Sequence, residues 1–341
     1  MKSKYVSIKD VAKITGLSPG TVSRALSRPE MVKEVTRKRI LDTVSQLGYV
    51  TNGVARALVN SKSYTVGAVI PRFGSATFST MLQTLESSLE KGGYRLLLSM
   101  PEISRVNEPS NIRTLIESGI DALVLLGALH PPETLAIIQN RNIPVVTMWS
   151  AVPGPLPGVH VDEQAGAFLI INHLASLGHQ KIAFISGVTQ NNERAAQRLR
   201  GIQLAVIANR MTLDEANIIE TRYGFEEGFK AALALVDRSH DITAIVCGND
   251  YLATGALSAL KSRGIRVPQD ISVTGINDND YAAYLNPSLT TISIPFEQIG
   301  QTAAKYLIEV LKGNHTPNVE THELKLVVRE STGQVRKNNL S

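Results

Sequence analysis

Apolar positions in the first fifty residues recur at helical spacing, and this pattern predicts three short helices. Residues 7–27 fit two helices around a tight turn, in which Gly16 ends the first helix in a left-handed conformation. Ser18 would cap the second helix, and Pro19 stands at its first position, where a missing N–H costs nothing. A third helix is expected over about 35–47. The inward faces would carry Val11, Ala12 and Ile14, then Val22, Ala25 and Leu26, and last Ile40, Val44 and Leu47.

Two short helices with a glycine in their turn, closed by a third, form a helix-turn-helix domain; a generic three-helix bundle is the alternative. The distribution of charge favours the first interpretation. The whole chain has a net charge of +5, but residues 1–62 contain 12 Lys and Arg against 4 Asp and Glu, and the remaining residues contain 23 against 26. A basic module on a mildly acidic body is typical of a protein that binds a phosphate backbone. A solubilising tail would not show such regular apolar positions.

From Tyr64 onward the pattern changes to apolar strands of about five residues that alternate with helices, which is typical of parallel α/β structure. These units are too many for one small sheet. We therefore expect two flavodoxin-like lobes, with a ligand in the crevice at the carboxyl ends of their strands. The expected strands are 65–70, 94–98, 122–126, 145–148, 181–185, 218–221, 244–247 and 271–276. The expected helices lie near 77–91, 108–118, 132–140, 163–177, 192–209, 224–236, 250–263 and 296–312.

The composition is that of an ordinary globular protein. Of the 341 residues 43% are apolar and 19% are charged, which is enough for a large core without disulfides. The single Cys247 excludes an internal disulfide and favours a reducing compartment. Residues 1–10 lack the apolar run of a signal peptide, and no apolar stretch approaches the ~18 residues that span a bilayer. We therefore expect a cytoplasmic protein with no membrane contact.

Several motifs occur in an order that resembles the LacI/GalR family of bacterial transcription regulators. In the N-terminal part these are DVAKITGLSPGTVSRALS (10–27), GYVTN (48–52) and VARAL (54–58). In the body they are HLASLGHQKIAFISG (173–187), RLRG (198–201), CGNDYLATGAL (247–257), GIRVPQDISVTGIND (264–278) and PSLTTI (287–292). A lone helix-turn-helix pattern would be a weak signal, whereas this ordered set covers nearly the whole chain.

The resemblance implies a helix-turn-helix headpiece over 6–50, a hinge helix over 51–61 and a two-lobed core over 62–341. The lobes, similar to those of periplasmic sugar-binding proteins, would comprise 62–161 with 293–322 and 162–292 with 323–341. It further implies a homodimeric repressor that binds a palindromic operator in double-stranded DNA, controlled by a small carbohydrate-type effector between the lobes, with no cofactor. The terminal QVRKNNLS lacks leucine heptads, which favours a dimer over a tetramer. A sugar-binding protein without a DNA role is the alternative, but it predicts a signal peptide and no basic headpiece.

The same resemblance places the second helix in the major groove, where Arg24 is the best candidate for a bidentate contact to guanine. Hydroxyl side chains at Thr21, Ser23 and Ser27 would hold phosphates, and plain helix surface is the alternative for each. The first two residues of this helix usually set operator choice in the family. Here they offer no side-chain donor, so we expect readout through backbone approach and DNA shape. The residues expected at the DNA are Ser18, Pro19, Gly20, Thr21, Ser23, Arg24 and Ser27, with Asn52, Ala55 and Leu58 in the hinge.

Residues 52–59 match the hinge helix of the family. Eight residues are too few for a stable isolated helix in water, so this helix should form only with a partner hinge and the minor groove. Leu58 would then be an apolar wedge between base steps, and a leucine packed on the core is the alternative. Thr51 stands where Pro is usual, and Gly53 lies at the helix start, so both reduce preorganisation.

Family positions carried onto this sequence place seven side chains in the effector cleft. Trp149 would either stack on a sugar ring or fill the core of a lobe, and the sequence leaves both open. Asn277 and Trp149 stand where carboxylates are frequent in the family, so Arg198 would lack an acid partner. We therefore expect an anionic effector, such as a sugar acid or sugar phosphate, held bidentately by Arg198. The rival is a neutral sugar, with Arg198 paired to an acid elsewhere; Asp250 is expected to cap the following helix. The cleft residues are Phe78, Trp149, Arg198, Tyr223, Asn249, Asn277 and Phe296.

Motifs of enzymes are not evident in the sequence. It contains no GxxxxGK[ST], HExxH or GxSxG pattern and no paired cysteines. The segment PRFGSATF after the first strand has one glycine, which argues against a nucleotide-handling enzyme. The seven histidines are scattered, and we expect no metal site. His173 and His179 flank a helix end, where packing or an interaction with the helix dipole is the default role.

Overall fold

The computed structural model describes residues 6–27, 29–49, 62–70, 77–100, 107–239, 241–314 and 321–335. The chain divides into two compact units, Met1–Tyr64 and Thr65–Ser341, and each has its own hydrophobic core. The expected hinge helix, with Asn52, Ala55 and Leu58, lies outside the described residues.

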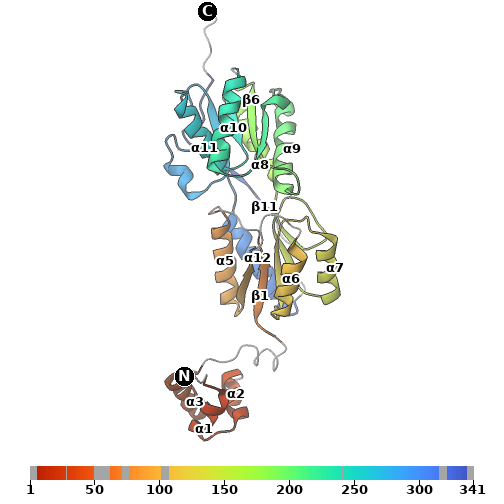
Figure 1. Ribbon diagram of the computed structural model, residues 1–341, viewed down its shortest axis with the longest axis vertical. Helices are drawn as coiled ribbons and strands as arrows, with labels where there is room; N and C mark the ends of the chain where they lie inside the picture. The colour runs from red at the N-terminus through yellow and green to blue at the C-terminus, as the bar shows by residue number, and fades with distance from the viewer. Residues whose placement is uncertain are drawn as a thin grey trace, which may run out of the picture. The chain divides into compact units, whose positions relative to one another are not determined.

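The first unit is helical. It contains α1 (Ile8–Thr15), α2 (Pro19–Ser27), the 3₁₀ turn η1 (Pro29–Met31) and α3 (Glu34–Leu47) (Figure 1). A capping box precedes α1, where the Asp10 carboxylate accepts a hydrogen bond from the Ser7 backbone N–H at 2.8 Å. Gly16 ends α1 at a φ of 66°, as the sequence predicted.

A small core joins the helices of the first unit, and one predicted member of it is wrong. Ile14 is 56% exposed. The buried stripe of α1 instead runs at spacings of three and four residues through Val11, Ala12 and Thr15, and Ile14 lies off it. Thr15 tolerates burial because its hydroxyl donates to the Val11 carbonyl at 2.8 Å. The buried apolar members are Val11, Ala12, Val22, Ala25 and Ile40.

The second unit contains two six-stranded sheets. The first has the order β11-β5-β4-β3-β1-β2 and the second the order β12-β10-β9-β8-β6-β7. All pairings are parallel except the antiparallel pair β10–β12. The first sheet consists of β1 (Thr65–Val69), β2 (Arg95–Ser99), β3 (Ala122–Leu126), β4 (Val145–Ser150), β5 (Gly158–Val161) and β11 (Thr321–His322). The second consists of β6 (Ile182–Gly187), β7 (Ile218–Thr221), β8 (Ala244–Cys247), β9 (Ser272–Asn277), β10 (Thr290–Ser293) and β12 (Lys325–Val327).

Helices cover both sheets and define two lobes (Figure 1). We call the first sheet with its helices the N-lobe and the second sheet with its helices the C-lobe. The N-lobe carries α5 (Thr77–Lys91), α6 (Glu108–Glu117), α7 (Pro132–Arg141) and α12 (Phe296–Leu311). The C-lobe carries α8 (Glu163–Ser176), α9 (Glu193–Ala208), α10 (Phe225–Arg238) and α11 (Asp250–Ser262), with the 3₁₀ turns η3 (Glu215–Asn217) and η4 (Asp280–Tyr284).

The chain passes between the lobes three times in the described residues: after β5, after β10 and after β11. The sequence predicted eight of the strands and the eight α-helices of this unit but not β5, β10, β11 and β12. These four have two to four residues each, and their few apolar residues form no recognisable pattern. In β10 the buried residues include Thr290 and Thr291, whose polarity hides the strand further.

Candidate functional sites

One candidate site is the outer face of α2 in the first unit. Ser18, Pro19, Gly20 and Arg24 are exposed there, while Val22 on the opposite face is buried. The Arg24 Nε donates to the Gly20 carbonyl at 3.2 Å, so the guanidinium lies along the helix toward its N-terminus. The first turn of α2 therefore presents a cation beside exposed backbone.

The predicted hydroxyl residues of α2 differ in how their side chains are used. The Ser18 Oγ accepts from the Thr21 backbone N–H at 3.1 Å and lies 2.9 Å from the Thr21 hydroxyl, so Ser18 caps the helix as predicted. The Ser27 hydroxyl donates to the Ser23 carbonyl at 2.8 Å. The hydroxyls of Ser18 and Thr21 thus gather at the helix N-terminus, and that of Ser27 is engaged within its own helix.

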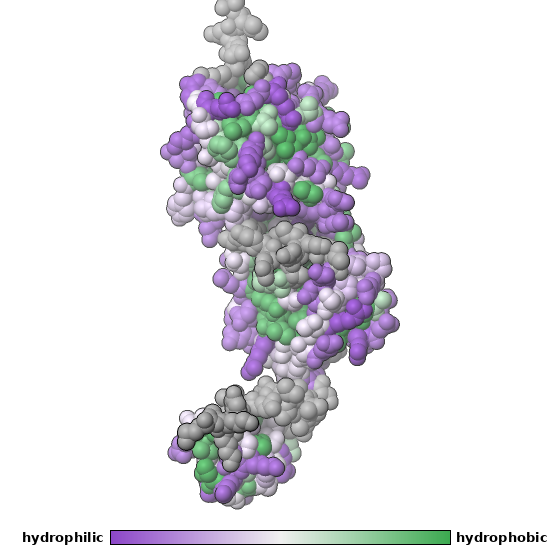
Figure 2. All heavy atoms as spheres, viewed as in Figure 1, coloured by the Kyte–Doolittle hydropathy of each residue, from purple (hydrophilic) through white to green (hydrophobic). Residues whose placement is uncertain are grey.

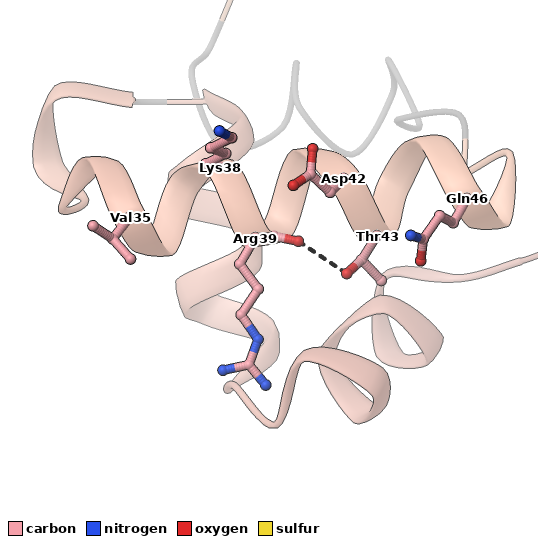
Figure 3. Close-up of a pocket in the computed structure, with 6 residues that line it drawn as sticks. All are labelled: Val35, Lys38, Arg39, Asp42, Thr43 and Gln46. Carbon is pink, nitrogen blue, oxygen red and sulfur yellow. Dashed lines mark hydrogen bonds between the residues drawn. The ribbon is translucent and has the colours of Figure 1, made fainter.

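Figure 3 shows a shallow hollow along α3, lined by Val35, Lys38, Arg39, Asp42, Thr43 and Gln46. All of these residues come from one helix, and Val35 is 84% exposed. The Thr43 hydroxyl donates to the Arg39 carbonyl at 2.9 Å. The hollow is a groove between surface side chains rather than an enclosed cavity, although it adds cations to the surface of this unit.

The second candidate site lies where the two lobes meet. The N-lobe contributes an aromatic cluster: Trp149, at the end of β4, lies 5.4 Å from Phe78 of α5 and 4.9 Å from Phe296 of α12, between ring centroids. All three side chains are buried. The C-lobe places Arg194 and Arg198 of α9 over the indole, with their Cζ atoms 4.8 and 5.8 Å from the ring centroid.

Arg198 does not lack an acid partner, so the premise of the anionic-effector hypothesis is wrong. Its Nε and Nη2 donate to the two carboxylate oxygens of Glu163 at 2.6 and 3.0 Å, and its Nη1 donates to the Gly248 carbonyl at 2.7 Å. Burial lowers the pKa of Arg198, but the Glu163 carboxylate and Tyr223 together outweigh burial, so that the pKa is raised. Glu163 was not predicted as the partner of Arg198, because an acid in the first turn of a helix such as α8 ordinarily complements the helix dipole.

Glu163 also connects the lobes. Its Oε1 accepts from the indole Nε1 of Trp149 at 2.8 Å, while both of its oxygens hold Arg198. Trp149 therefore belongs at once to the aromatic core of the N-lobe and to a buried polar network of the C-lobe. The structure thus shows Trp149 as a core residue of the N-lobe. Because its indole also faces the C-lobe, the second predicted role, stacking on a sugar ring, stays a prediction.

The predicted N-cap of α11 is wrong by one residue. Asn249, expected in the cleft, is the N-cap: its Oδ1 accepts from the Leu252 N–H at 2.9 Å. Asp250, expected as the cap, is fully buried and accepts from Asn279 and Thr291, including a 2.6 Å bond from the Thr291 hydroxyl. Burial raises the pKa of Asp250 to about 7. Asp250 thus fixes the loop after β9 rather than the helix start.

Strained backbone marks the lobe ends at this site. Trp149 has a φ of 51° and Asn277, at the end of β9, has a φ of 119°, conformations that are rare for residues other than glycine. Asn277 is 5% exposed, and its Oδ1 has no hydrogen-bond partner in the described part of the chain. Strain and an unpaired buried acceptor at strand ends are features that ligand sites often show.

Tyr223, the last predicted cleft residue, follows β7 and is 37% exposed. Its ring packs so closely on the end of β6 that a Cβ at Gly187 would lie 2.2 Å from the Tyr223 Cζ. Tyr223 also contributes to the raised pKa of Arg198. The site therefore joins the aromatic cluster of Phe78, Trp149 and Phe296 with Arg198 and Tyr223. Asn249 is occupied as a helix cap. Three charged residues at the lobe boundary were not predicted from the sequence: Glu163, Glu193 and Arg194.

Within the described ranges, no cluster of three or more His, Cys, Asp or Glu could hold a metal ion. Likewise, none of the helices in that part of the chain is long and apolar enough to cross a bilayer.

Two family models match the chain. Residues 7–52 match the bacterial regulatory proteins of the lacI family, and residues 171–332 match a periplasmic binding protein-like domain. The HTH-type transcriptional repressor CytR of Escherichia coli K12 is 31% identical over 329 residues, which cover 96% of each chain. The HTH-type transcriptional repressor PurR of Photobacterium profundum is 30% identical over 328 residues, which cover 95% of this chain and 98% of the relative.

Solved structures show the same likeness. A Lac repressor dimer bound to operator and the anti-inducer ONPF matches with a TM-score of 0.88 at 26% identity, covering 97% of this chain and 100% of that chain. A complex of the transcriptional regulator CelR with cellobiose matches with a TM-score of 0.72 at 26% identity, covering 96% and 99%.

Proposed function

This chain belongs to the lacI family of bacterial regulatory proteins, and we propose that it is a repressor whose binding to operator DNA is controlled by a small molecule between its lobes. The observation that carries the DNA role is the exposed outer face of α2, where the Arg24 guanidinium reaches back to the Gly20 carbonyl, within a segment of 12 Lys and Arg against 4 Asp and Glu. Binding to a chromosome places the protein in the bacterial cytoplasm, and the role requires no cofactor.

We assign the direct reading of bases to Arg24. Its fork of donors matches the acceptors of guanine in the major groove. Pro19 and Gly20 let the backbone approach the bases closely, and Ser18, Thr21, Ser23 and Ser27 hold or flank phosphates. In the hinge, Asn52, Ala55 and Leu58 would meet the minor groove, with Leu58 as the wedge between base steps.

The protein would act as a homodimer on a palindromic operator. In the N-lobe, the sheet-edge strand β2 and the residue after it expose Leu97, Leu98 and Met100, which are 37%, 42% and 44% exposed. In the C-lobe, Phe225 is 49% exposed and lies in an aromatic cluster with Tyr251 and Tyr281. Apolar residues also reach the surface of both lobes in Figure 2. A second copy would cover such patches, and the related Lac repressor structure contains a dimer.

The effector is a small, neutral, carbohydrate-type molecule. The charge of Arg198 is balanced within the protein by Glu163, so the site does not demand an anion. An apolar ring face would meet the cluster of Trp149, Phe78 and Phe296, and a hydroxyl would satisfy the Asn277 Oδ1. The related CelR was solved with cellobiose, a neutral sugar.

Selection from a pool of randomised duplexes, followed by gel-shift titration, tests the DNA role. Full-length protein should enrich a palindrome, and Arg24→Ala should lose discrimination at one guanine per half-site. Failure to enrich any sequence at low salt would end the regulator proposal.

A thermal-shift screen with matched neutral sugars, sugar acids and sugar phosphates tests the effector class. Neutral sugars should stabilise the wild type and should stabilise Asn277→Ala much less. Stabilisation by anionic compounds alone would contradict a neutral effector.

A further inference from the structure

Glu193, the first residue of α9 in the C-lobe, is held by the backbone of the opposite lobe. Its carboxylate accepts from the Ala128 N–H at 2.8 and 2.9 Å, from the Leu129 N–H at 2.9 Å and from the Ala151 N–H at 3.2 Å. The side chain is buried, with 4% of the residue exposed. One carboxylate of the C-lobe is thus bound by three amides of the N-lobe.

These N-lobe amides form an anion-binding nest. Ala128 and Leu129 follow β3, and Gly127 before them has a φ of 78°, the left-handed turn that brings successive N–H groups to one side of the backbone. Ala151 follows β4, so its amide comes from the adjacent strand end. Such concave sets of N–H groups bind carboxylates and phosphates.

Buried side chains brace the nest from within the N-lobe. His130 places Nε2 2.9 Å from the Gly127 carbonyl and Nδ1 2.9 Å from Glu108, and the Thr134 hydroxyl donates to the same Glu108 oxygen at 3.0 Å. The His130 side chain is fully buried. The loop is therefore fixed independently of the C-lobe, so the nest is preformed on the N-lobe.

The position of Glu193 on the C-lobe suits an anion as well. A carboxylate in the first turn of α9 lies at the positive end of the helix dipole. His160 on β5 is near enough for the Glu193 charge to act on its pKa, although burial lowers that pKa overall. Among the described residues, the buried charge is thus compensated by the helix dipole and the N-lobe amides.

We propose that the amides of Ala128, Leu129 and Ala151 are an anion site that the protein fills with its own Glu193, so that this carboxylate latches the lobes together without effector. The inference rests on the proposed function and concerns its regulation. An effector bound between the lobes would then act on a molecule that is already mostly closed. The apparent affinity for the effector would depend on the latch, because it decreases when a smaller fraction of the molecules is in the closed, binding-competent state.

Trp149 makes closure measurable, since it is the only tryptophan of the chain and touches Glu163 and α9 across the lobe boundary. The experiment uses full-length protein and follows Trp149 emission and acrylamide quenching in Glu193→Ala. We expect the open-to-closed ratio to rise about tenfold or more, because hydrogen bonds to a charged group are lost. The emission should shift to longer wavelength and quenching should become steeper.

Chemical rescue then identifies the nest as an anion site. Sodium acetate, titrated against sodium chloride at matched ionic strength, should restore wild-type emission to Glu193→Ala, and acetamide should not. The matched control is Glu220→Ala: that carboxylate also accepts from a backbone N–H, Thr189 at 2.9 Å, but within the C-lobe. Its emission should equal that of the wild type.

Wild-type emission and quenching in Glu193→Ala would overturn the latch, as would equal rescue by acetamide and acetate. If Glu193→Ala fails to fold, as judged by circular dichroism, Glu193→Gln replaces it. Glu193→Gln keeps the size of the side chain, but its amide NH2 would face the N–H groups of the nest. The same shift in emission is therefore expected, and wild-type emission would again contradict the latch. The fluorescence assay needs no DNA, so failure of the repressor proposal would be seen separately in the duplex selection.

Discussion

Arg24 and Arg198 show how differently the two units use a cation. Arg24 lies exposed on α2, with its Nε on the Gly20 carbonyl of the same helix. Arg198 is buried in the C-lobe, and its guanidinium meets both oxygens of Glu163. The cation of the helical unit is open to an external anion, whereas that of the lobes is neutralised from within.

The difference extends to the other charged groups of each unit. The helical unit keeps its cations on exposed surfaces, such as Lys38 and Arg39 of α3. The lobes bury Glu163, Glu193 and Arg198 and satisfy them with protein atoms. We infer that charge in the first unit serves DNA binding, while charge at the lobe boundary serves the conformation of the sensor.

The largest expected effect comes from separating the buried ion pair. Glu163→Gln should destabilise the second unit by about 3–5 kcal/mol, because it leaves Arg198 buried without its counter-ion. Denaturant unfolding followed by Trp149 emission measures this loss. The control is Glu133→Gln, which breaks the exposed pair with Arg113 and should change stability little. Equal effects of the two substitutions would remove the contrast between internal and external charge.

A smaller effect is expected at the DNA surface. Arg24→Ala should weaken binding to the selected operator by about tenfold to a hundredfold, through loss of a bidentate base contact. Its stability should be that of the wild type because the side chain is exposed. Gel-shift titration compares it with Arg39→Ala on α3, which should lose less and show no change of preferred sequence. Unaltered affinity and specificity in Arg24→Ala would refute the base contact.

Mild acid should affect the two units differently. Burial lowers the pKa of His179 to about 4, and its ring bonds Thr243 and Gly333 in the C-lobe. The unfolded state takes up a proton below about pH 6.5 and the folded state does not. His179 should therefore cost the second unit about 2 kcal/mol, allowing for solvent screening, as the pH falls from 6.5 to 4, whereas Asp250, whose raised pKa favours the folded state below about pH 7, acts in the opposite direction.

Residues 1–62 contain no histidine, so the helical unit should keep its stability over most of that pH range. Hydrogen exchange followed by mass spectrometry at several pH values reads the two units separately, because peptides of residues 1–62 are resolved from peptides of the lobes. Replacing His179 by Gln should remove this loss, so that acid destabilises the lobes less than in the wild type. Parallel loss of both signals in the wild type would contradict the assignment to His179.

The smallest expected effect is local to α1. Gly16→Ala should cost the first unit about 1 kcal/mol, because the φ of 66° strains a residue with a Cβ although no atom lies within 4 Å. Hydrogen exchange of the backbone amides in residues 6–27, followed by mass spectrometry, measures it. Emission of Trp149 during unfolding should not change, and a shift in that signal would show that the units do not unfold separately.

The sequence predicted what local patterns determine and failed where partners come from distant segments. The helices and long strands were predictable because apolar periodicity and caps such as Gly16 act within a few residues. The partner of Arg198 was not, because Glu163 lies 35 residues away and looks like an ordinary first-turn acid. The cap of α11 was misassigned for a similar reason: adjacent polar residues can each cap a helix, and only the bond from the distant Thr291 to Asp250 shows that Asn249 takes that role.

Salt dependence of operator binding tests the central claim most directly. The measurement compares the slope of log affinity against log salt for the wild type and two triple Gln variants. One replaces Arg24, Arg37 and Arg39 of the helical unit, and the other replaces the exposed Arg113, Lys230 and Arg263 of the lobes. We predict that the steepness of this slope falls by about 0.9 for each phosphate contact that the first variant removes, while the second variant keeps the wild-type slope. Equal slopes for the two variants would contradict the claim that the external charge of this protein is concentrated in its helical unit for DNA.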